Sequence, residues 1–133
     1  MKTQELSPEQ IRNECRETLQ QHLSDNENII MCGKRFENNN CYYFLFTEYR
    51  GLWLAVRKGL TQFLYLGDPT VMSIPLQEVT SIRERYLGWH IFELIGKSDD
   101  TKVGFSFDKK DDFYLRFTKR LREQIDIAKR SNP

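Results

Sequence analysis

Between residues 28 and 108 the chain consists of short apolar runs, roughly five to eight residues long, separated by Gly, Asn, Asp and Pro. The runs are rich in aromatic and β-branched residues, which fit a pleated, half-buried surface. No apolar pattern of helical period and length interrupts them. This region therefore predicts an antiparallel β domain, with strands at Ile29–Phe36, Tyr42–Tyr49, Leu52–Arg57, Gln62–Leu66, Val71–Ile74, Val79–Tyr86, Trp89–Ile95 and Thr101–Phe107.

Two of the predicted strands differ in how their apolar residues are spaced. Val103, Phe105 and Phe107 alternate with polar or small residues, so this strand has one buried face. The run Tyr42–Phe46 does not alternate, which indicates a strand covered on both faces or an exposed aromatic patch. We expect this strand to meet the N-terminal helix described next.

An N-terminal helix is predicted to begin at Pro8, because Ser7 and Gln10 have the spacing of a capping box around it. Its apolar residues recur every four positions up to the polar segment 24–26, forming a narrow stripe. The stripe consists of Ile11, Cys15, Leu19 and Leu23. Such a helix is expected on the outside of the main fold or against a partner.

A second helix is predicted from Asp111 to about Lys129. Acidic residues precede it and basic residues end it, as the helix dipole favours. Its apolar stripe, again at four-residue spacing, is Phe113, Phe117, Leu121 and Ile125.

The composition limits the class of function. With 133 residues, 39% hydrophobic and 29% charged, the chain is sized for one packed domain, here residues 28–133, with a helical extension at residues 1–27. Its net charge of +1 predicts no nucleic-acid partner.

The segment MKTQELSPEQ lacks the apolar core of a signal peptide, so we expect a cytoplasmic protein whose cysteines, Cys15, Cys32 and Cys41, are free thiols.

Residues for catalysis are sparse. The two histidines, His22 and His90, have no neighbours at metal-ligand spacing, and the glycines are scattered rather than grouped as in a phosphate-binding loop. We therefore expect no enzyme activity, no cofactor and no metal. A nucleophilic pair of His90 with Cys32 or Cys41 stays open, because such pairs are formed by the fold and not by local sequence.

Basic residues fall at predicted strand ends and turns, and they could converge at one end of a barrel. They are Lys34, Arg35, Arg50, Arg57, Lys58, Arg83 and Arg85, of which Arg83 and Arg85 share a strand face. Glutamates are interleaved among them, so a solvated sheet face explains the same pattern.

The segment Leu54–Leu66, followed by Ile74-Pro75-Leu76-Gln77-Glu78-Val79-Thr80-Ser81-Ile82 and a terminal amphipathic helix, resembles the bacterial pleckstrin-homology-like and GRAM-type domains. The resemblance implies a mainly β, α+β fold: an antiparallel barrel or two packed sheets with a C-terminal capping helix. The N-terminal helix is additional to the family pattern.

The resemblance also implies a non-enzymatic binding or adaptor module. We hypothesise that it takes a protein or peptide segment along an exposed sheet edge or beside the C-terminal helix, and that Trp53 contributes. An anionic membrane surface contacting Lys34, Arg35, Arg57 and Lys58 is the alternative, although the turn 37–40 departs from the basic cluster of lipid-binding members. A ligand carrier with an enclosed cavity and a homo-oligomer stay open. The candidate binding residues are Lys34, Arg35, Tyr43, Arg57, Lys58, Arg83 and Arg85.

Overall fold

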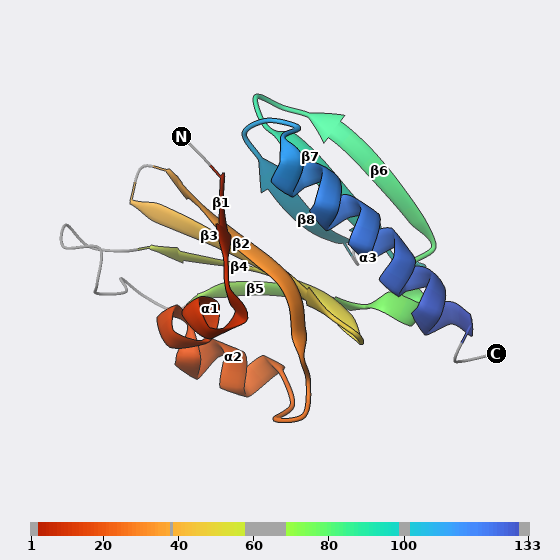
Figure 1. The fold of residues 1–133 in the computed structure, drawn as a ribbon, viewed down its shortest axis with the longest axis horizontal. Coiled ribbons are helices and arrows are strands. Elements are labelled where there is room, and N and C mark those ends of the chain that lie inside the picture. Colours follow the sequence, from red (N-terminus) through yellow and green to blue (C-terminus); the bar gives the residue numbers. More distant parts are fainter. Residues whose placement is uncertain (1–2, 38, 58–68, 99–101, 131–133) are drawn as a thin grey trace.

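A computed structural model describes residues 3–37, 39–57, 69–98 and 102–130. Two antiparallel sheets and three α-helices make up this part of the chain (Figure 1). Most predicted strands are present within two residues of their expected ends, and the predicted strand Gln62–Leu66 lies outside the described residues. The elements are β1 (Thr3–Leu6), α1 (Pro8–Glu14), α2 (Arg16–His22), β2 (Ile29–Glu37), β3 (Asn40–Thr47), β4 (Arg50–Arg57), β5 (Thr70–Pro75), the 3₁₀ helix η1 (Leu76–Glu78), β6 (Ser81–Tyr86), β7 (His90–Ile95), β8 (Lys102–Phe107) and α3 (Asp112–Arg130).

The larger sheet has the order β1-β2-β3-β4-β5 and the smaller one the order β6-β7-β8. The two sheets pack against each other and do not close into a barrel, so the two-sheet form of the predicted fold is correct and the barrel form is wrong. The reason lies at the end of β5, where Pro75 has no N–H to donate and the chain turns through η1. As a result, β6 starts a second sheet instead of extending the first.

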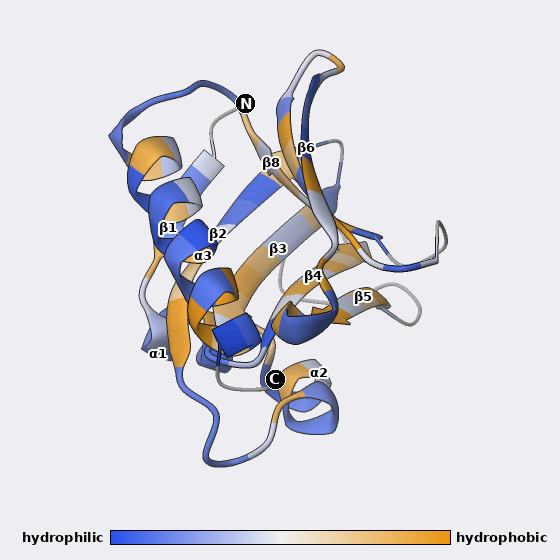
Figure 2. Ribbon diagram, turned by 90° about the vertical axis from the view of Figure 1, so that its right-hand side faces the viewer, coloured by the Kyte–Doolittle hydropathy of each residue, from blue (hydrophilic) through white to orange (hydrophobic). Residues whose placement is uncertain are grey.

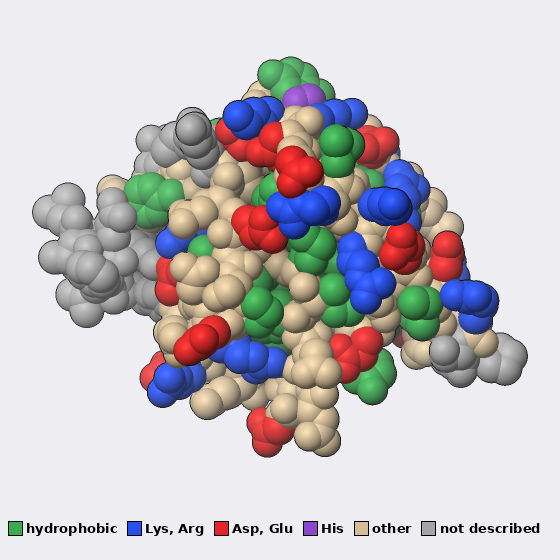
Figure 3. Space-filling view, viewed as in Figure 1, with side chains coloured by type: hydrophobic (Ala, Val, Ile, Leu, Met, Phe, Trp, Pro, Cys, Tyr) green, Lys and Arg blue, Asp and Glu red, His purple; other side chains and the backbone are tan. Residues whose placement is uncertain are grey.

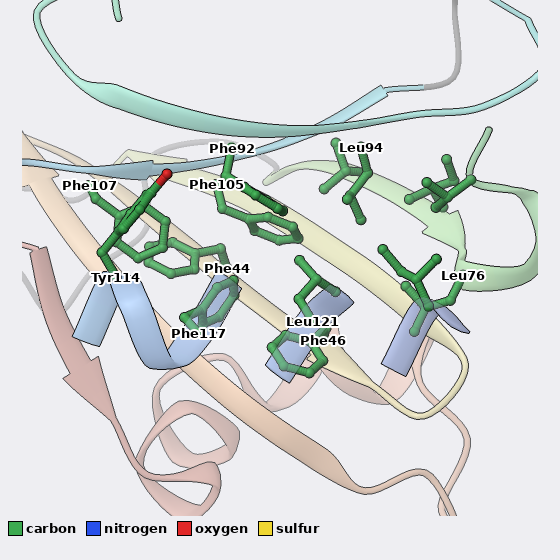
Figure 4. Close-up of a cluster of buried hydrophobic side chains, with 14 of the residues drawn as sticks. Phe44, Phe46, Leu76, Phe92, Leu94, Phe105, Phe107, Tyr114, Phe117 and Leu121 are labelled. Atoms are coloured by element: carbon green, nitrogen blue, oxygen red, sulfur yellow. The ribbon is translucent and has the colours of Figure 1, made fainter. Parts of the chain in front are cut away.

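The main core fills the space between the two sheets and α3. Phe117 of α3 lies at its centre, with its ring centroid 5.0 Å from that of Phe46 and 5.4 Å from that of Phe44, both nearly edge-on. Figure 4 shows Phe117 and Leu121 pointing from the helix toward these two β3 rings. The apolar stripe predicted for the C-terminal helix is therefore the surface that joins the helix to both sheets.

A second core lies on the opposite face of the five-stranded sheet, beneath α1 and α2. Tyr43 and Leu45 of β3 point into it and are fully buried. Figure 1 shows the two short helices and α3 on opposite sides of this sheet, and Figure 2 shows β3 as mostly hydrophobic. Of the two alternatives left open for the non-alternating run 42–46, cover on both faces holds for residues 43–46, while Tyr42 is half-buried. The expected contact of this strand with the N-terminal helix is confirmed.

The N-terminal helix is broken at Cys15, where the predicted helix was continuous. Cys15 has φ −126° and ψ 31°, outside helical geometry, and separates α1 from α2. A four-residue repeat drifts by about 40° around a straight helix at each step. The break lets both halves turn their apolar residues to the sheet, and all four stripe residues are buried against this protein's own strands. The capping box of Ser7 and Gln10 is present as predicted.

Strand β1 was not predicted, because a four-residue segment carries no period of its own. It pairs antiparallel with β2, and Thr3 exchanges hydrogen bonds of 2.9 Å with Asp108 at the end of β8. Gly33 of β2 allows this close approach, since a Cβ there would lie 2.9 Å from the carbonyl oxygen of Gln4 and 2.9 Å from the ring of Phe44.

A buried carboxylate, Glu27, connects the N-terminal helices to the larger sheet. It accepts hydrogen bonds from Thr47 Oγ1 at 2.7 Å, Arg50 Nε at 2.8 Å and the backbone N–H of Ser24 at 3.1 Å. Burial by itself would raise the pKa of Glu27, but these donors and the charge of Arg50 outweigh it, so the pKa lies below its ordinary value of 4.5.

We predict that Glu27→Gln lowers the free energy of unfolding by about 1–3 kcal/mol at pH 7. The folded pKa of Glu27 is lowered, so its stabilising contribution is present above pH 4.5 and is lost as the pH falls through the folded pKa. Urea denaturation at pH 7 and at about pH 3 measures the difference between the two proteins, which should shrink in acid.

The matched control is Glu48→Gln, which alters a half-exposed carboxylate whose one hydrogen-bond donor among the described residues is the backbone N–H of Asn28, at 3.1 Å. Its effect should be less than half as large. An equal loss from Glu27→Gln at both pH values would show that the charge of Glu27 is not the source of stability.

Candidate binding site

The basic residues predicted to converge are divided between the two faces of the larger sheet. Lys34 and Arg35 are consecutive on β2, so their side chains point in opposite directions. Lys34 lies on the side of α1, where its Nζ is 2.9 Å from Glu14 Oε1. Arg35 lies on the other face, toward β8. A joint basic patch of these two residues is therefore excluded by strand alternation.

Tyr43, predicted as a binding residue, belongs to the second core. Its side chain has no exposed surface, and its hydroxyl donates to Glu14 Oε1 at 2.9 Å. Burial, followed by the nearby Cys41, raises the pKa of Tyr43 above its usual range. Its assignment to a binding surface is corrected, because β3 is covered on both faces and Tyr43 faces the N-terminal helices.

Arg83 and Arg85 lie on one face of β6, and both reach the same carboxylate. Glu93 of β7 lies 2.6 Å from Arg83 NH2 and 3.7 Å from Arg85 NH1. Arg57 ends β4, and its side chain, like the whole of Lys58, lies outside the described residues.

A groove opens where the outer face of the smaller sheet meets the larger sheet. Its volume is about 350 Å³, and it includes Arg35 and the Glu93 that holds Arg83 and Arg85. Residues from six strands line it, and we call it the inter-sheet groove: Arg35, Tyr42, Trp53, Met72, Ile91, Glu93, Lys102, Gly104 and Ser106.

The apolar wall of the inter-sheet groove is a pair of stacked aromatic rings. Tyr42 of β3 and Trp53 of β4 have ring centroids 5.9 Å apart and an interplanar angle of 21°. Both rings are half-buried, and Met72, opposite Trp53 in the β4–β5 register, is 38% exposed. The groove thus presents accessible apolar surface to a ligand.

Arg35 is held rigidly at one side of the groove. Its guanidinium carbon lies 4.6 Å from the centroid of Tyr42 and 3.9 Å from that of Trp89. Its Nε donates to Ser106 Oγ at 2.9 Å, and its NH1 pairs with Glu37 at 2.5 Å. Stacking and pairing of this kind fix the guanidinium in place, so Arg35 shapes the groove more than it supplies free charge.

The nucleophilic pair that the sequence left open does not form among the described residues. His90 lies between Tyr86 and Tyr114, with centroids 4.9 Å and 6.4 Å away. The three cysteines form no disulfide within the described ranges and are buried in the second core, on the far side of the larger sheet. Burial, followed by the charge of Glu5, raises the pKa of Cys32 to about 12. In the described part of the chain no three His, Cys, Asp or Glu residues form a group that could hold a metal ion.

Comparison with known proteins identifies the fold. No family model matches the sequence, and no curated protein matches it. A solved DUF1696 family protein with a pleckstrin-homology domain, from Shewanella loihica PV-4, is 14% identical with a TM-score of 0.60, over 96% of this chain and 97% of that one. A pleckstrin homology domain from Shewanella amazonensis SB2B is 15% identical with a TM-score of 0.56, over 90% and 98% of the two chains. The fold is pleckstrin-homology-like.

These similarities confirm the predicted α+β, mainly β fold class with its C-terminal helix. The fold by itself does not specify a function, so the chemistry of the site must indicate what is bound. None of the helices in the described ranges is long and apolar enough to cross a membrane.

Sequence reasoning missed most of this pleckstrin-homology-like domain's groove. It left open whether the run that includes Tyr42 is covered or exposed, and it gave Glu93 no role. A usable signal was present for Arg35 and Tyr42: they lie directly opposite each other in the β2–β3 hairpin, across the polar turn that the sequence did predict. No local signal indicates that Trp53, eleven residues later, stacks on Tyr42.

We predict that Tyr43→Ala lowers the stability of this pleckstrin-homology-like domain by about 3–5 kcal/mol, because it leaves a cavity beneath the N-terminal helices. Tyr43→Phe removes only the hydroxyl that donates to Glu14 and should cost about 1 kcal/mol. Thermal and urea denaturation measure both. A folded Tyr43→Ala protein with unchanged stability would return this residue to the candidate binding surface.

Proposed function

We propose that this protein is a binding module that takes an extended peptide segment of a protein partner in the inter-sheet groove. The observation that carries the proposal is the half-buried Tyr42–Trp53 stack, which forms an apolar wall open to a ligand. Partly exposed aromatic side chains with a fixed orientation are typical anchors of peptide recognition.

Strand edges beside the groove favour an extended peptide. Among the described strands, the larger sheet ends at β5 and the smaller sheet ends at β8, and both strands contribute residues to the groove. Most side chains of β5 are exposed. An edge strand offers unpaired N–H and C=O groups, to which a peptide backbone can add as a further strand.

The chemistry of the groove indicates what one side chain of the peptide would be. Trp53, Met72 and Ile91 supply apolar contacts, while the charges of Arg35 and Glu93 are already paired. The volume of about 350 Å³ lies near the lower end of the range of ligand pockets. An aromatic or branched aliphatic side chain fits this combination best, with the rest of the peptide running along the strand edge.

The alternative of a membrane contact through Lys34, Arg35, Arg57 and Lys58 receives less support. Lys34 and Arg35 lie on opposite faces of β2 and each is paired with a glutamate. A bilayer is nearly flat at this scale, so residues on opposite faces of one strand cannot both meet it.

The test is selection from a displayed library of random peptides, followed by measurement of the affinity of the enriched peptides. We expect enriched peptides to share an aromatic or branched aliphatic residue. Trp53→Leu, which keeps an apolar contact to the core, should weaken their binding about tenfold. Gly104→Val should also weaken it, because a Cβ at Gly104 lies 3.3 Å from the side chain of Ile91 and narrows the groove.

The control is Tyr49→Leu, a matched change at a tyrosine that is 59% exposed and does not line the groove. It should leave the affinity unchanged. Thermal unfolding of each variant separates loss of binding from loss of fold. Peptides that bind wild-type and Trp53→Leu proteins equally, or a library with no enrichment, would contradict the proposal.

A further inference from the structure

Lys102 of β8 belongs to the charged outer face of the smaller sheet. The strand register places Arg83 opposite Glu93, and Glu93 opposite Gly104. Lys102 precedes Gly104 by two residues, so its side chain shares this face and is a diagonal neighbour of Glu93. Lys102, Gly104 and Glu93 all line the inter-sheet groove. The charge of Lys102 is therefore part of the groove.

The neighbouring carboxylate does not neutralise Lys102. Glu93 Oε1 accepts hydrogen bonds from Arg83 Nε at 2.8 Å and from Arg83 Nη2 at 2.6 Å, and Glu93 Oε2 lies 3.7 Å from Arg85 Nη1. Lys102 is half-buried, and within the described ranges it has no acidic partner at ion-pair distance. A partly buried ammonium is screened less by salt than an exposed one, so it favours a carboxylate brought by a ligand.

Positive charge is in excess around the groove as a whole, although the net charge of the chain is only +1. The carboxylates of Glu37 and Glu93 are shared by four cationic side chains: Arg35, Arg83, Arg85 and Lys102. The face that carries α3 is different, because Figure 3 shows side chains of both signs interspersed over it. The inter-sheet groove is thus complementary to negative charge.

Strand β8 also offers backbone groups beside Lys102. The carbonyl oxygen of Ser106 accepts a hydrogen bond from Thr3 Oγ1 at 3.4 Å, so it points away from β7. In an antiparallel pair the backbone groups of every second residue point the same way. Those of Gly104 and Lys102 therefore also point away from β7, the one strand that pairs with β8 among the described residues. They are available to the backbone of a peptide.

The pleat of a strand fixes where the side chains of such a peptide lie. Alternate side chains of an added strand point to the groove, so one can face Gly104 while the next on that face, two residues away, faces Lys102. Gly104 has no side chain and leaves room for the apolar anchor beside Trp53 and Met72. The spacing of two residues holds for a parallel and for an antiparallel peptide.

We propose that the peptide taken by the inter-sheet groove carries an aspartate or a glutamate two residues from its apolar anchor, and that Lys102 binds this carboxylate. The inference rests on the proposed function and adds to it the charge of the partner and the position of that charge. The ammonium of Lys102 donates to the carboxylate, while the anchor contacts the Tyr42–Trp53 stack. The partner is a protein with an acidic, extended segment.

The experiment is a parallel selection of displayed random peptides on the wild-type protein and on Lys102→Glu. Constant residues flank the random segment at both ends, so that every selected carboxylate is a side chain. Peptides enriched by the wild type should carry Asp or Glu two residues from an aromatic or branched aliphatic residue. Peptides enriched by Lys102→Glu should lose this preference or carry Lys or Arg at the same position.

A charge exchange then tests the contact directly. Replacing the acidic residue of the strongest peptide by lysine should weaken its binding to the wild type about tenfold. The same lysine peptide should bind Lys102→Glu more tightly than it binds the wild type. A structural disturbance caused by Lys102→Glu cannot produce this gain.

The matched control is Lys119→Glu, which makes the same change in net charge at an exposed residue of α3 that does not line the groove. At physiological salt it should select the same peptides as the wild type and bind them with an affinity within about twofold of it. Thermal unfolding of both variants checks that they are folded.

The outcomes separate this inference from the proposed function. Wild-type selection of the apolar anchor without an acidic residue at the stated spacing would overturn the inference and leave the proposed function standing. A library with no enrichment would overturn both. Equal losses from Lys102→Glu and Lys119→Glu would show attraction by net charge and would overturn the contact with Lys102.

Discussion

The structure depends on a single five-stranded sheet that is buried on both faces. Its strand β3 places Phe44 and Phe46 in the main core under α3, and Tyr43 and Leu45 in the second core under α1 and α2. Each core uses alternate residues of the same strand, so neither can change without moving the other. Glu27 and the pairing of β1 with β2 join the N-terminal segment to this sheet, which makes that segment part of one packing unit with the strands.

Burial of both sheet faces decides where a ligand can bind. The larger sheet offers little exposed face, so accessible binding surface is left at its edges and at the junction with the smaller sheet. Because consecutive side chains of a strand point to opposite faces, Lys34 lies beneath α1 and Arg35 lies at that junction, where the rings of Tyr42 and Trp53 stack. The basic cluster expected from the sequence is not formed, and an aromatic groove with one immobilised arginine lies at the junction instead. The apolar lining of this groove favours a peptide side chain over a phosphate.

The smaller sheet is covered on one face only, by α3 and the main core. Its outer face carries Arg83, Arg85 and Glu93 and forms a wall of the inter-sheet groove, and two exposed apolar side chains, Tyr86 and Leu87, lie at its β6–β7 turn.

The sequence by itself determined the elements whose signals are local. The capping box at Ser7, the stripe of α3 and the uninterrupted run 42–46 each depend on residues a few positions apart, and each predicted its element correctly. Only the tertiary structure decided the break at Cys15, the pairing of β1 and the composition of the groove. These depend on contacts between residues distant in the chain, such as Thr3 with Asp108 and Arg35 with Trp89, which no local period encodes. The side chain of a basic residue in a strand points to one of the two faces of the sheet. The element packed on that face determines whether its charge is buried, paired or accessible to a ligand.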